Sequence, residues 1–242
     1  MPEWLADIVQ QFETCFIREA RWKLLAGGLG RTLIITFFAL LLGIVIGIFV
    51  SIIRSTYDLN YTSMRRGPGK VFLKIGNIIC TVYLTVIRGT PVVVQLLICY
   101  FIILISVRNG VVVAALTFGI NSGAYVAELI RGGIMSVDKG QSEAGRSLGF
   151  NYVQTMRYIV LPQALKTVIP ALANEFIVLL KETSIAGYVG VVDLTKAGDI
   201  IRGSTFLPFM PLIAVALTYL ILVVFFSWLV GKLERRLRSN EH

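Results

Sequence analysis

The chain has 242 residues, of which 56% are hydrophobic and only 15% are charged, and its mean hydropathy is +0.77. This composition excludes an ordinary water-soluble globular protein and indicates an integral membrane protein. The net charge of +9 does not indicate nucleic-acid binding, because the basic residues lie beside apolar runs and not on one face of a soluble domain.

The N-terminal segment carries charges of both signs and precedes the first long apolar run. Large apolar residues recur there at every fourth position, at Trp4, Ile8, Phe12 and Phe16. This period predicts an amphipathic helix that lies on the membrane surface. A disordered leader is the alternative for this segment.

The first predicted span covers residues 32–53, which carry no charge. Its 22 residues suffice to cross a bilayer, since a crossing helix needs about 20 residues. Gly43 and Gly47 lie four residues apart within this span and form a small-residue face that favours close packing against another helix. A basic loop, residues 54–74, follows.

The second predicted span is long and broken, and runs from residue 75 to residue 107. The sequence Arg88-Gly89-Thr90-Pro91 interrupts it. Proline lacks a backbone donor and a central arginine costs several kcal/mol in lipid, so we expect Arg88 to be buried in protein or water.

A third span is predicted at residues 111–130, and Glu128 and Arg131 near its end are spaced to form a local ion pair. The fourth is expected to begin near Lys166 and is unusually polar. The last is expected within the uncharged run 203–231.

A polar stretch that begins at Asp138 interrupts the apolar sequence between the third and fourth spans. Asp138 and Gln141 have the spacing of a capping box, and Gly149 predicts the end of the helix. Glu143 and Arg146 are spaced to pair across one turn. We therefore predict one short helix that lies along a membrane face.

The distribution of basic residues predicts the orientation. Fourteen of the 23 Lys and Arg residues fall in residues 54–74, 131–166 and 231–242, and seven fall in the segments on the other side. Basic segments stay in the cytoplasm, so the polar helix and the C-terminus are predicted inside and the N-terminus outside.

The motifs resemble one known family. The spacing Glu143-Ala144-x-x-x-x-Gly149, followed by Ile159-x-Leu161-Pro162, resembles the EAA loop (about 138–162) of the membrane subunits of type I ABC importers. Three further stretches resemble the permeases of this family that carry polar amino acids: 83–95, 121–134 and 181–184. Gly145 departs from the family pattern, which usually has alanine there; it costs up to about 1 kcal/mol of helix propensity and allows closer approach.

The resemblance implies an all-α membrane protein with five transmembrane helices, an N-terminal amphipathic helix and a cytoplasmic coupling helix. The expected organisation is an exterior or interfacial segment 1–27, a transmembrane domain 28–235 and a basic cytoplasmic tail 236–242. The residues implied to couple the chain to an ATPase are Gln141, Glu143, Ala144, Gly145, Ser147, Leu148 and Gly149.

The resemblance also implies the partners of the chain. These are two copies of an ABC ATPase, a second permease subunit that is identical or different, and an extracellular or periplasmic substrate-binding protein. The expected location is a bacterial cell membrane with its lipid, and the expected cargo is a polar amino acid. ATP and Mg²⁺ would bind to the ATPase.

Polar residues inside the predicted spans are candidates for a substrate pathway, because a free amino acid presents both a carboxylate and an ammonium group. An ion-pair network with a purely structural role is the alternative. The candidates are Lys181, Glu182, Thr183, Ser184, Asn174 and Arg88.

No constellation for catalysis, metal binding or nucleotide binding is found. Cys15, Cys80 and Cys99 are far apart in sequence, the lone His242 is terminal, and no phosphate-binding Gly-rich motif is present. We therefore expect a transport subunit without enzymatic activity, metal or cofactor of its own. A secondary transporter or channel that works alone is the second hypothesis, and a membrane enzyme is a distant third. The sequence does not identify the amino acid.

Overall fold

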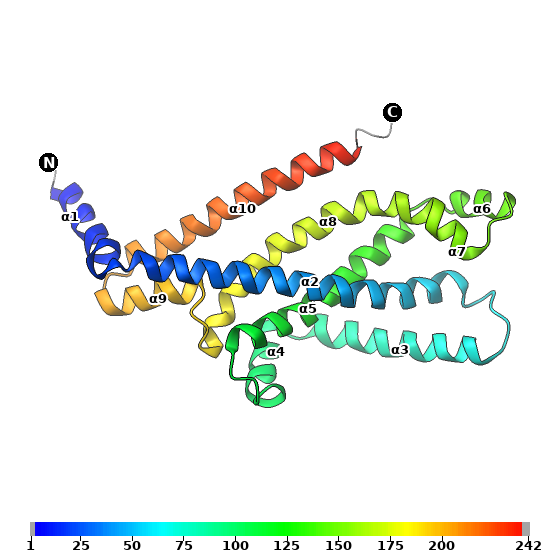
Figure 1. Ribbon diagram of the computed structural model, residues 1–242, viewed down its shortest axis with the longest axis horizontal. Coiled ribbons are helices and arrows are strands. Elements are labelled where there is room, and N and C mark those ends of the chain that lie inside the picture. The colour runs from blue at the N-terminus through cyan, green and yellow to red at the C-terminus, as the bar shows by residue number, and fades with distance from the viewer. Residues whose placement is uncertain (1–2, 239–242) are drawn as a thin grey trace. The chain divides into compact units, whose positions relative to one another are not determined.

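The computed structural model describes residues 3–238, and all of its regular structure is helical (Figure 1). In chain order the elements are α1 (Glu3–Phe12), η1 (Glu13–Ile17), η2 (Arg18–Ala20), α2 (Trp22–Asn60), α3 (Pro68–Gly89), α4 (Val92–Ile98), η3 (Cys99–Ile103), α5 (Gly110–Met135), α6 (Lys139–Ser147), α7 (Tyr152–Thr155), η4 (Met156–Val160), α8 (Leu161–Glu182), η5 (Thr183–Val189), α9 (Leu194–Thr205) and α10 (Phe209–Arg238).

Five helical segments of the described chain are long and apolar enough to cross a membrane, which confirms the predicted number. They are Trp22–Asn60, Pro68–Gly89, Gly110–Met135, Tyr152–Val189 and Phe209–Leu237. Several extend well past the apolar runs from which they were predicted. Hydropathy marks the part of a helix that lies in lipid, whereas the helix itself ends at caps and tertiary contacts.

The second predicted span is confirmed only up to its interruption. Helix α3 begins with Pro68 in its first turn, a favoured position for proline, and ends at Gly89. Thr90 is extended (φ −121°, ψ 146°) because it precedes Pro91. The stretch after the break is a separate short helix, α4 with η3, which agrees with the predicted interruption but ends at Ile103 and not at residue 107.

The boundaries of the last two spans also differ from the prediction. The helix of the fourth span starts at Tyr152, well before Lys166. Helix α9, which the sequence analysis missed, occupies the first residues of the run assigned to the last span, and α10 starts only at Phe209. Charged residues recur every three positions in α9 and interrupt its apolar residues, so the sequence shows no long apolar run from which this helix could be predicted.

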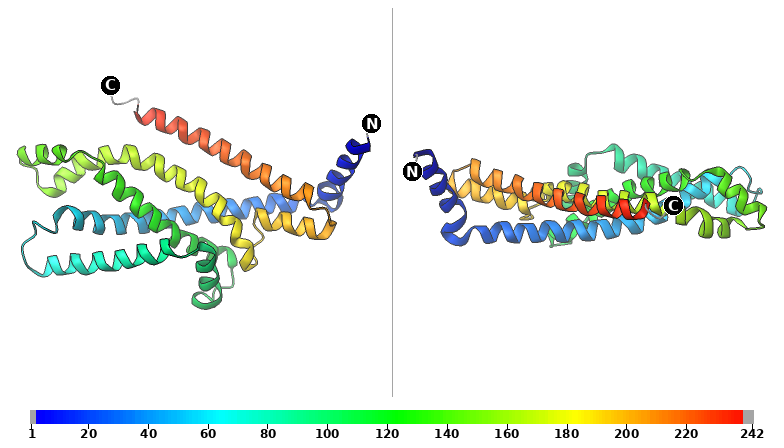
Figure 2. Two further views of the ribbon diagram at one scale, coloured as in Figure 1. Left: turned by 180° about the vertical axis from the view of Figure 1, so that it is seen from behind. Right: turned by 90° about the horizontal axis from the view of Figure 1, so that it is seen from above.

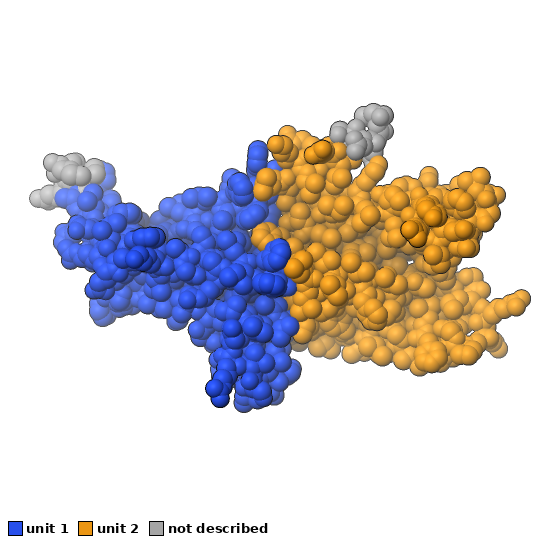
Figure 3. Space-filling model, in the orientation of Figure 1, with its two compact units in different colours: residues 1–39, 93–118, 177–228 blue, residues 40–92, 119–176, 229–242 orange. Residues whose placement is uncertain are grey.

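The described chain divides into two compact units (Figure 3). Unit 1 contains the N-terminal part up to Ala39 together with residues 93–118 and 177–228. Unit 2 contains residues 40–92, 119–176 and the chain from Leu229. Several long helices therefore contribute to both units.

In unit 2, glycines on α2 and α5 allow the two helices to approach closely. A Cβ atom at Gly47 would lie 2.4 Å from Val126 Cγ1, and one at Gly43 would lie 2.9 Å from Ser122 Oγ. The approach is reciprocal, since a Cβ at Gly123 on α5 would lie 2.8 Å from a side-chain carbon of α2. The predicted small-residue face of the first span is thus the contact surface with α5.

Helix α3 packs beside the C-terminal half of α2 in unit 2 (Figure 2). Val50 of α2 shares a buried apolar cluster with Cys80 and Leu84 of α3. Near the end of this contact, Arg54 Nη1 donates to Asn77 Oδ1 at 2.7 Å. Arg54, a charged residue on a membrane helix, is thereby held by a polar partner on its neighbour.

In unit 1, the N-terminal segment packs on α9. Cys15 and Phe16 of η1 form a buried cluster with Ile201 of α9. Trp4 and Phe12 of α1 remain exposed, as expected for one apolar side of an interfacial helix. The predicted N-terminal helix is confirmed, and the alternative of a disordered leader does not apply to α1.

The loop before α9 is fastened to α2 within unit 1. Gly190 is left-handed (φ 77°), and Asp193 caps α9 by accepting from the N–H groups of Lys196 and Thr195 at 3.0 and 3.1 Å. The backbone of Asp193 approaches Gly28 so closely that a Cβ there would lie 2.6 Å from the Asp193 carbonyl oxygen. The start of α9 is therefore fixed by residues far away in sequence.

Asp193 gives a prediction about pH. It is fully buried, and burial raises the pKa of its carboxyl, while hydrogen bonds from Lys196 and Thr195 oppose part of the rise. The folded state therefore binds this proton more tightly than the unfolded chain. The contribution to stability is present below the ordinary pKa of about 4 and is lost as pH rises through the raised value.

For Asp193→Asn, we therefore expect the thermal midpoint of the purified protein to gain on wild type as pH rises from about 4 to about 7. Asp199→Asn is the control, because the hydrogen bond from Arg202, and then Lys196, lowers the pKa of the exposed Asp199 carboxyl. Its stabilising contribution is lost only as pH falls below about 4, through the lowered pKa, so the difference between Asp199→Asn and wild type is expected to stay nearly constant from about pH 4 to about 7. A constant difference between Asp193→Asn and wild type across this range would contradict the prediction.

Candidate functional site

Helix α6 has defined caps at both ends. Asp138 is its N-cap and accepts from the Gly140 N–H at 2.6 Å. At the other end, the Gly149 N–H donates to the Arg146 carbonyl and the Phe150 N–H to the Gly145 carbonyl, at 2.9 and 3.0 Å. With Gly149 at φ 83°, these bonds form a Schellman motif. The predicted start and stop of this helix are confirmed.

Two finer predictions about α6 are wrong. The Asp138 side chain bonds one residue earlier than in a capping box, and the Gln141 side chain instead accepts from Gln163 Nε2 of α8 at 3.3 Å. Glu143 and Arg146 form no ion pair within residues 3–238. Both side chains are exposed, where water competes with a pair that is worth little.

Gly145 faces inward, toward η4 and α7. It is buried, and a Cβ at this position would lie 2.8 Å from Ile159 Cδ1 and 3.1 Å from Thr155 Oγ1. Glycine thus lets α6 lie directly on the start of the fourth span. The close approach expected for glycine at this position is thus observed, and the end of the Ile159 side chain is flexible enough to yield to one methyl group.

The remaining predicted coupling residues lie on the outer surface of α6 and at its C-terminus. Leu148 is 75% exposed, a large value for an apolar side chain on so short a helix. Ser147 is exposed, and its hydroxyl donates to the Glu143 carbonyl at 3.1 Å. The exposed members of the set are Gln141, Glu143, Ala144, Ser147, Leu148 and Gly149.

The support beneath α6 contains a second cap that the sequence analysis missed. Asn151 and Gln154 form a complete capping box at the start of α7, with both bonds at 2.9 Å. The Asn-x-x-Gln spacing was available as a signal. Below it, Ile134, Val160 and Ala164 form a buried cluster that joins α5 to α8. Helix α6 therefore rests on a structured base and not on a loop.

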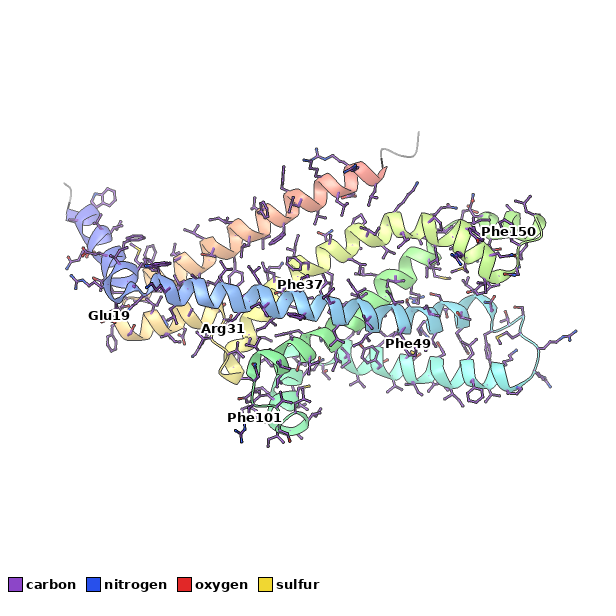
Figure 4. All side chains as sticks on the ribbon, viewed as in Figure 1. Glu19, Arg31, Phe37, Phe49, Phe101 and Phe150 are labelled. Carbon is purple, nitrogen blue, oxygen red and sulfur yellow. The ribbon has the colours of Figure 1, made fainter. Side chains whose placement is uncertain are left out.

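A cavity of about 560 Å³ lies between α6 and the ends of α2 and α5 in unit 2. Its lining carries charges of both signs, among them Asp58 and Arg146, and includes Phe150, which lies beside α6 and α7 (Figure 4). Arg131 pairs with Glu128 at 2.9 Å, as predicted, and also with Asp58 of the cavity lining at 3.2 Å. The second partner joins α2 to α5 and could not be read from local spacing.

Four of the predicted pathway residues lie in unit 1, at the end of α8 and the start of η5. Lys181 is exposed and Glu182 is half-buried. Thr183 is fully buried, and its hydroxyl donates to the Leu180 carbonyl at 2.9 Å. Ser184 is half-buried. All four side chains are polar and belong to a helical segment long enough to cross the membrane. Placing polar side chains in lipid costs free energy, so such residues are candidates for a functional role.

The other two predicted pathway residues, Arg88 and Asn174, lie in unit 2 and are exposed there. The guanidinium of Arg88 lies over the Tyr125 ring, 5.6 Å from its centroid. Arg88 is therefore exposed on this chain and stabilised by an aromatic face at the end of α3, and its location in protein or water stays a prediction.

One polar contact in the same unit was not predicted. Glu175 of α8 is buried and accepts from Ser122 Oγ of α5 at 2.8 Å. A carboxyl group inside a membrane bundle is a functional candidate, and its neighbour Asn174 was singled out instead. A charged residue in the fourth span could have marked Glu175 as a candidate from the sequence alone. Its partner Ser122 could not be predicted in this way, because it lies on another helix.

Chemistry by a bound metal ion has no support in the described chain. Within residues 3–238, no three His, Cys, Asp or Glu side chains lie close enough together to hold one. What the site offers is a capped helix with an exposed apolar end, joined by packing to two membrane-spanning helices. An element of this kind can pass a displacement on to the helices on which it is packed.

Comparison with known proteins places these features in a family. Residues 69–239 match the family described as "Binding-protein-dependent transport system inner membrane component". The glutamine transport system permease protein GlnP of Escherichia coli K12 is 39% identical over 168 residues, which cover 68% of this chain and 77% of that protein. A putative GlnP of Rickettsia typhi is 35% identical over 212 residues, which cover 86% and 90% of the two chains.

Solved structures agree. A crystal structure described as an amino acid ABC transporter with histidines matches with a TM-score of 0.79 and 38% identity, over 91% of this chain and 98% of that one. The inward-facing MetNI methionine ABC transporter matches with a TM-score of 0.73 over 89% and 97% of the chains, and at 21% identity it supports the fold alone.

The family match covers more than half of the chain and includes α6 and four of the five spans. A binding-protein-dependent ABC transporter implies an ATPase partner and a binding-protein partner. The chain therefore belongs to the family of binding-protein-dependent transport system inner membrane components, as a multi-pass membrane permease of an ABC importer and not as its ATPase.

Proposed function

We propose that this chain is the permease subunit of an importer for glutamine or a closely related polar amino acid. The observation that carries the proposal is its identity of 35–39% to glutamine permeases over 168–212 residues, combined with a capped and exposed α6 between two spans. The likeness to a solved amino acid ABC transporter at 38% identity supports the same substrate class.

In the proposed assembly, two permease subunits, identical or different, are joined to two ATPase subunits in the cytoplasm and receive substrate from an external binding protein. ATP and Mg²⁺ bind to the ATPase. The positive-inside bias supports a cytoplasmic α6 and C-terminus and an external N-terminus. The exposed residues of α6, with Leu148 at its end, form the surface that docks on the ATPase.

The mechanism we propose is mechanical. Closure of the two ATPases on ATP displaces α6, and the base formed by α7, η4 and the end of α5 transmits this displacement to α5 and α8. The spans then change from inward-open to outward-open, and hydrolysis reverses the change. The Schellman motif and the buried Gly145 support this role, because force passes through α6 only if it is rigid and firmly seated.

The test is uptake in proteoliposomes. The chain, co-expressed with its ATPase and reconstituted, is expected to import radiolabelled glutamine only with external binding protein and internal ATP. Competition with unlabelled amino acids then ranks the substrates. Uptake by the chain without an ATPase would instead support the second candidate, a stand-alone transporter, which accounts for the polar residues of the spans but not for α6.

For the substrate pathway, we propose that Lys181, Glu182, Thr183, Ser184, Asn174 and Arg88 provide polar contacts for the amino acid. A carboxylate needs a cationic or N–H partner, and Lys181 is an exposed cation on α8. A structural ion-pair network remains the alternative role for these residues.

Lys181→Ala is expected to lower glutamine uptake by about tenfold to a hundredfold, since a hydrogen bond to a charged group contributes about 1.5–3 kcal/mol. ATPase co-purification is expected to be unchanged. Lys74→Ala, which removes an exposed lysine from α3, is the matched control. Wild-type uptake by the Lys181 variant would exclude this residue from the pathway.

A further inference from the structure

A shallow hollow in unit 1 carries positive charge without a balancing acid. It has a volume of about 590 Å³ and lies among the N-terminal half of α2, the turn before α5 and the loop after η5. Arg31, Arg108, Tyr100 and Asn109 line it, and glycine and valine residues make up the rest of its wall. No aspartate or glutamate is among its lining residues.

The two arginines are held differently. Arg31 Nη1 donates to the Val192 carbonyl at 2.9 Å, which fixes its guanidinium beside the loop (Figure 4). Arg108 is exposed and has no hydrogen bond or ion pair within residues 3–238. Arg108 precedes Asn109, whose side chain caps α5 at the Val111 N–H, so the positive end of that helix lies at the same rim.

The carboxylates of Asp193 and of helix α9 do not line the hollow and have other partners. Both carboxylate oxygens of Asp193 are engaged in the cap of α9, and Asp199 pairs with Lys196 and Arg202, at 3.0 and 2.6 Å. A guanidinium offers five donors in a plane and suits a carboxylate. The hollow therefore presents unused donors and net positive charge to an anionic partner.

The topology predicted from the sequence indicates which partner can reach the hollow. Arg31 directly precedes the uncharged run 32–53 of the first span, and Arg108 lies between the second and third spans. Both arginines belong to the segments that the distribution of basic residues assigns to the side opposite residues 131–166. The hollow is therefore on the external face under the proposed function.

We propose that this hollow is the docking point for aspartate or glutamate side chains of the external substrate-binding protein; this inference rests on the proposed function. A free amino acid is a less suitable occupant. Its carboxylate would find donors, but its ammonium group would face two guanidinium groups and no carboxylate. Exposed positive charge around a shallow hollow attracts a negatively charged protein surface and fixes the orientation in which it docks.

The test uses Arg108→Glu, because Arg108 makes no contact that the fold requires, whereas Arg31 supports the loop. The reconstituted complex is titrated with the glutamine-loaded binding protein that stimulates ATP hydrolysis by the wild-type complex. We expect the concentration for half-maximal stimulation to rise about tenfold or more, with the maximal and basal rates unchanged. Arg18→Glu, at an exposed arginine away from the hollow, is the matched control and is expected to change it less than twofold.

Two further measurements identify the occupant. For the wild type, the binding-protein concentration for half-maximal stimulation should rise when salt increases from about 50 to about 300 mM. The Arg108→Glu variant should show a weaker rise, because salt screens an attraction that the variant lacks. Binding of radiolabelled free glutamine to the purified complex should be unaffected. An unchanged half-saturation in Arg108→Glu, or a loss of free-glutamine binding, would overturn the inference. If no binding protein stimulates even the wild type, the proposed function itself fails.

Discussion

Gly47→Leu is expected to prevent this chain from forming a stable membrane bundle. A single Cβ at Gly47 would lie 2.4 Å from Val126 Cγ1, 2.7 Å from Val126 Cβ and 3.0 Å from the Ala127 backbone nitrogen. Two of these atoms are fixed to the α5 backbone and cannot rotate away. Overpacking a tight contact costs about 1–3 kcal/mol for extra methylenes, and a leucine here must also separate two helices, so we expect the loss to exceed that range.

The measurement is the yield of monodisperse protein in detergent and its thermal midpoint. Gly47→Ala is a milder change, and we expect it to lower the thermal midpoint by several degrees. Gly30→Ala on the same helix is the matched control, because a Cβ at Gly30 meets nothing within 4 Å and alanine favours the helix. A wild-type midpoint for Gly47→Leu would show that α2 and α5 do not pack in the way described.

Leu148→Asp is expected to abolish ATP-driven uptake while leaving the permease folded. Leu148 is 75% exposed at the end of α6, so its replacement removes little packing within the chain. At an interface, a carboxylate in place of an apolar anchor must be desolvated without a partner, which costs several kcal/mol. We expect ATPase affinity to fall by about a hundredfold or more.

Co-purification of the ATPase, glutamine uptake and the thermal midpoint of the isolated permease together test this prediction. Thr62→Asp introduces the same charge at another exposed position on the predicted cytoplasmic side and is expected to behave as wild type. If Leu148→Asp retains the ATPase and full uptake, α6 is not the docking surface. If the variant loses thermal stability instead, Leu148 has a structural role.

The candidate site was predictable to the extent that its signals are local. Asp138 and Gly149 marked the two ends of α6, and both were confirmed. The capping box at Gln141 was wrong, because Gln163 of α8 offers that side chain a competing hydrogen bond. The inward position of Gly145 follows from Ile159 and Thr155, which are close only after the chain turns back through α7.

The same distinction holds for the fold. The sequence by itself determined the number of spans, the break before Pro91 and the presence of a capped polar helix, because hydropathy, proline and glycine act over a few residues. Only the tertiary structure decided how α2 meets α5, where Glu175 finds Ser122, and that two arginines share one hollow. These features depend on side chains from separate helices, and the free energy of such contacts exists only once the helices are packed.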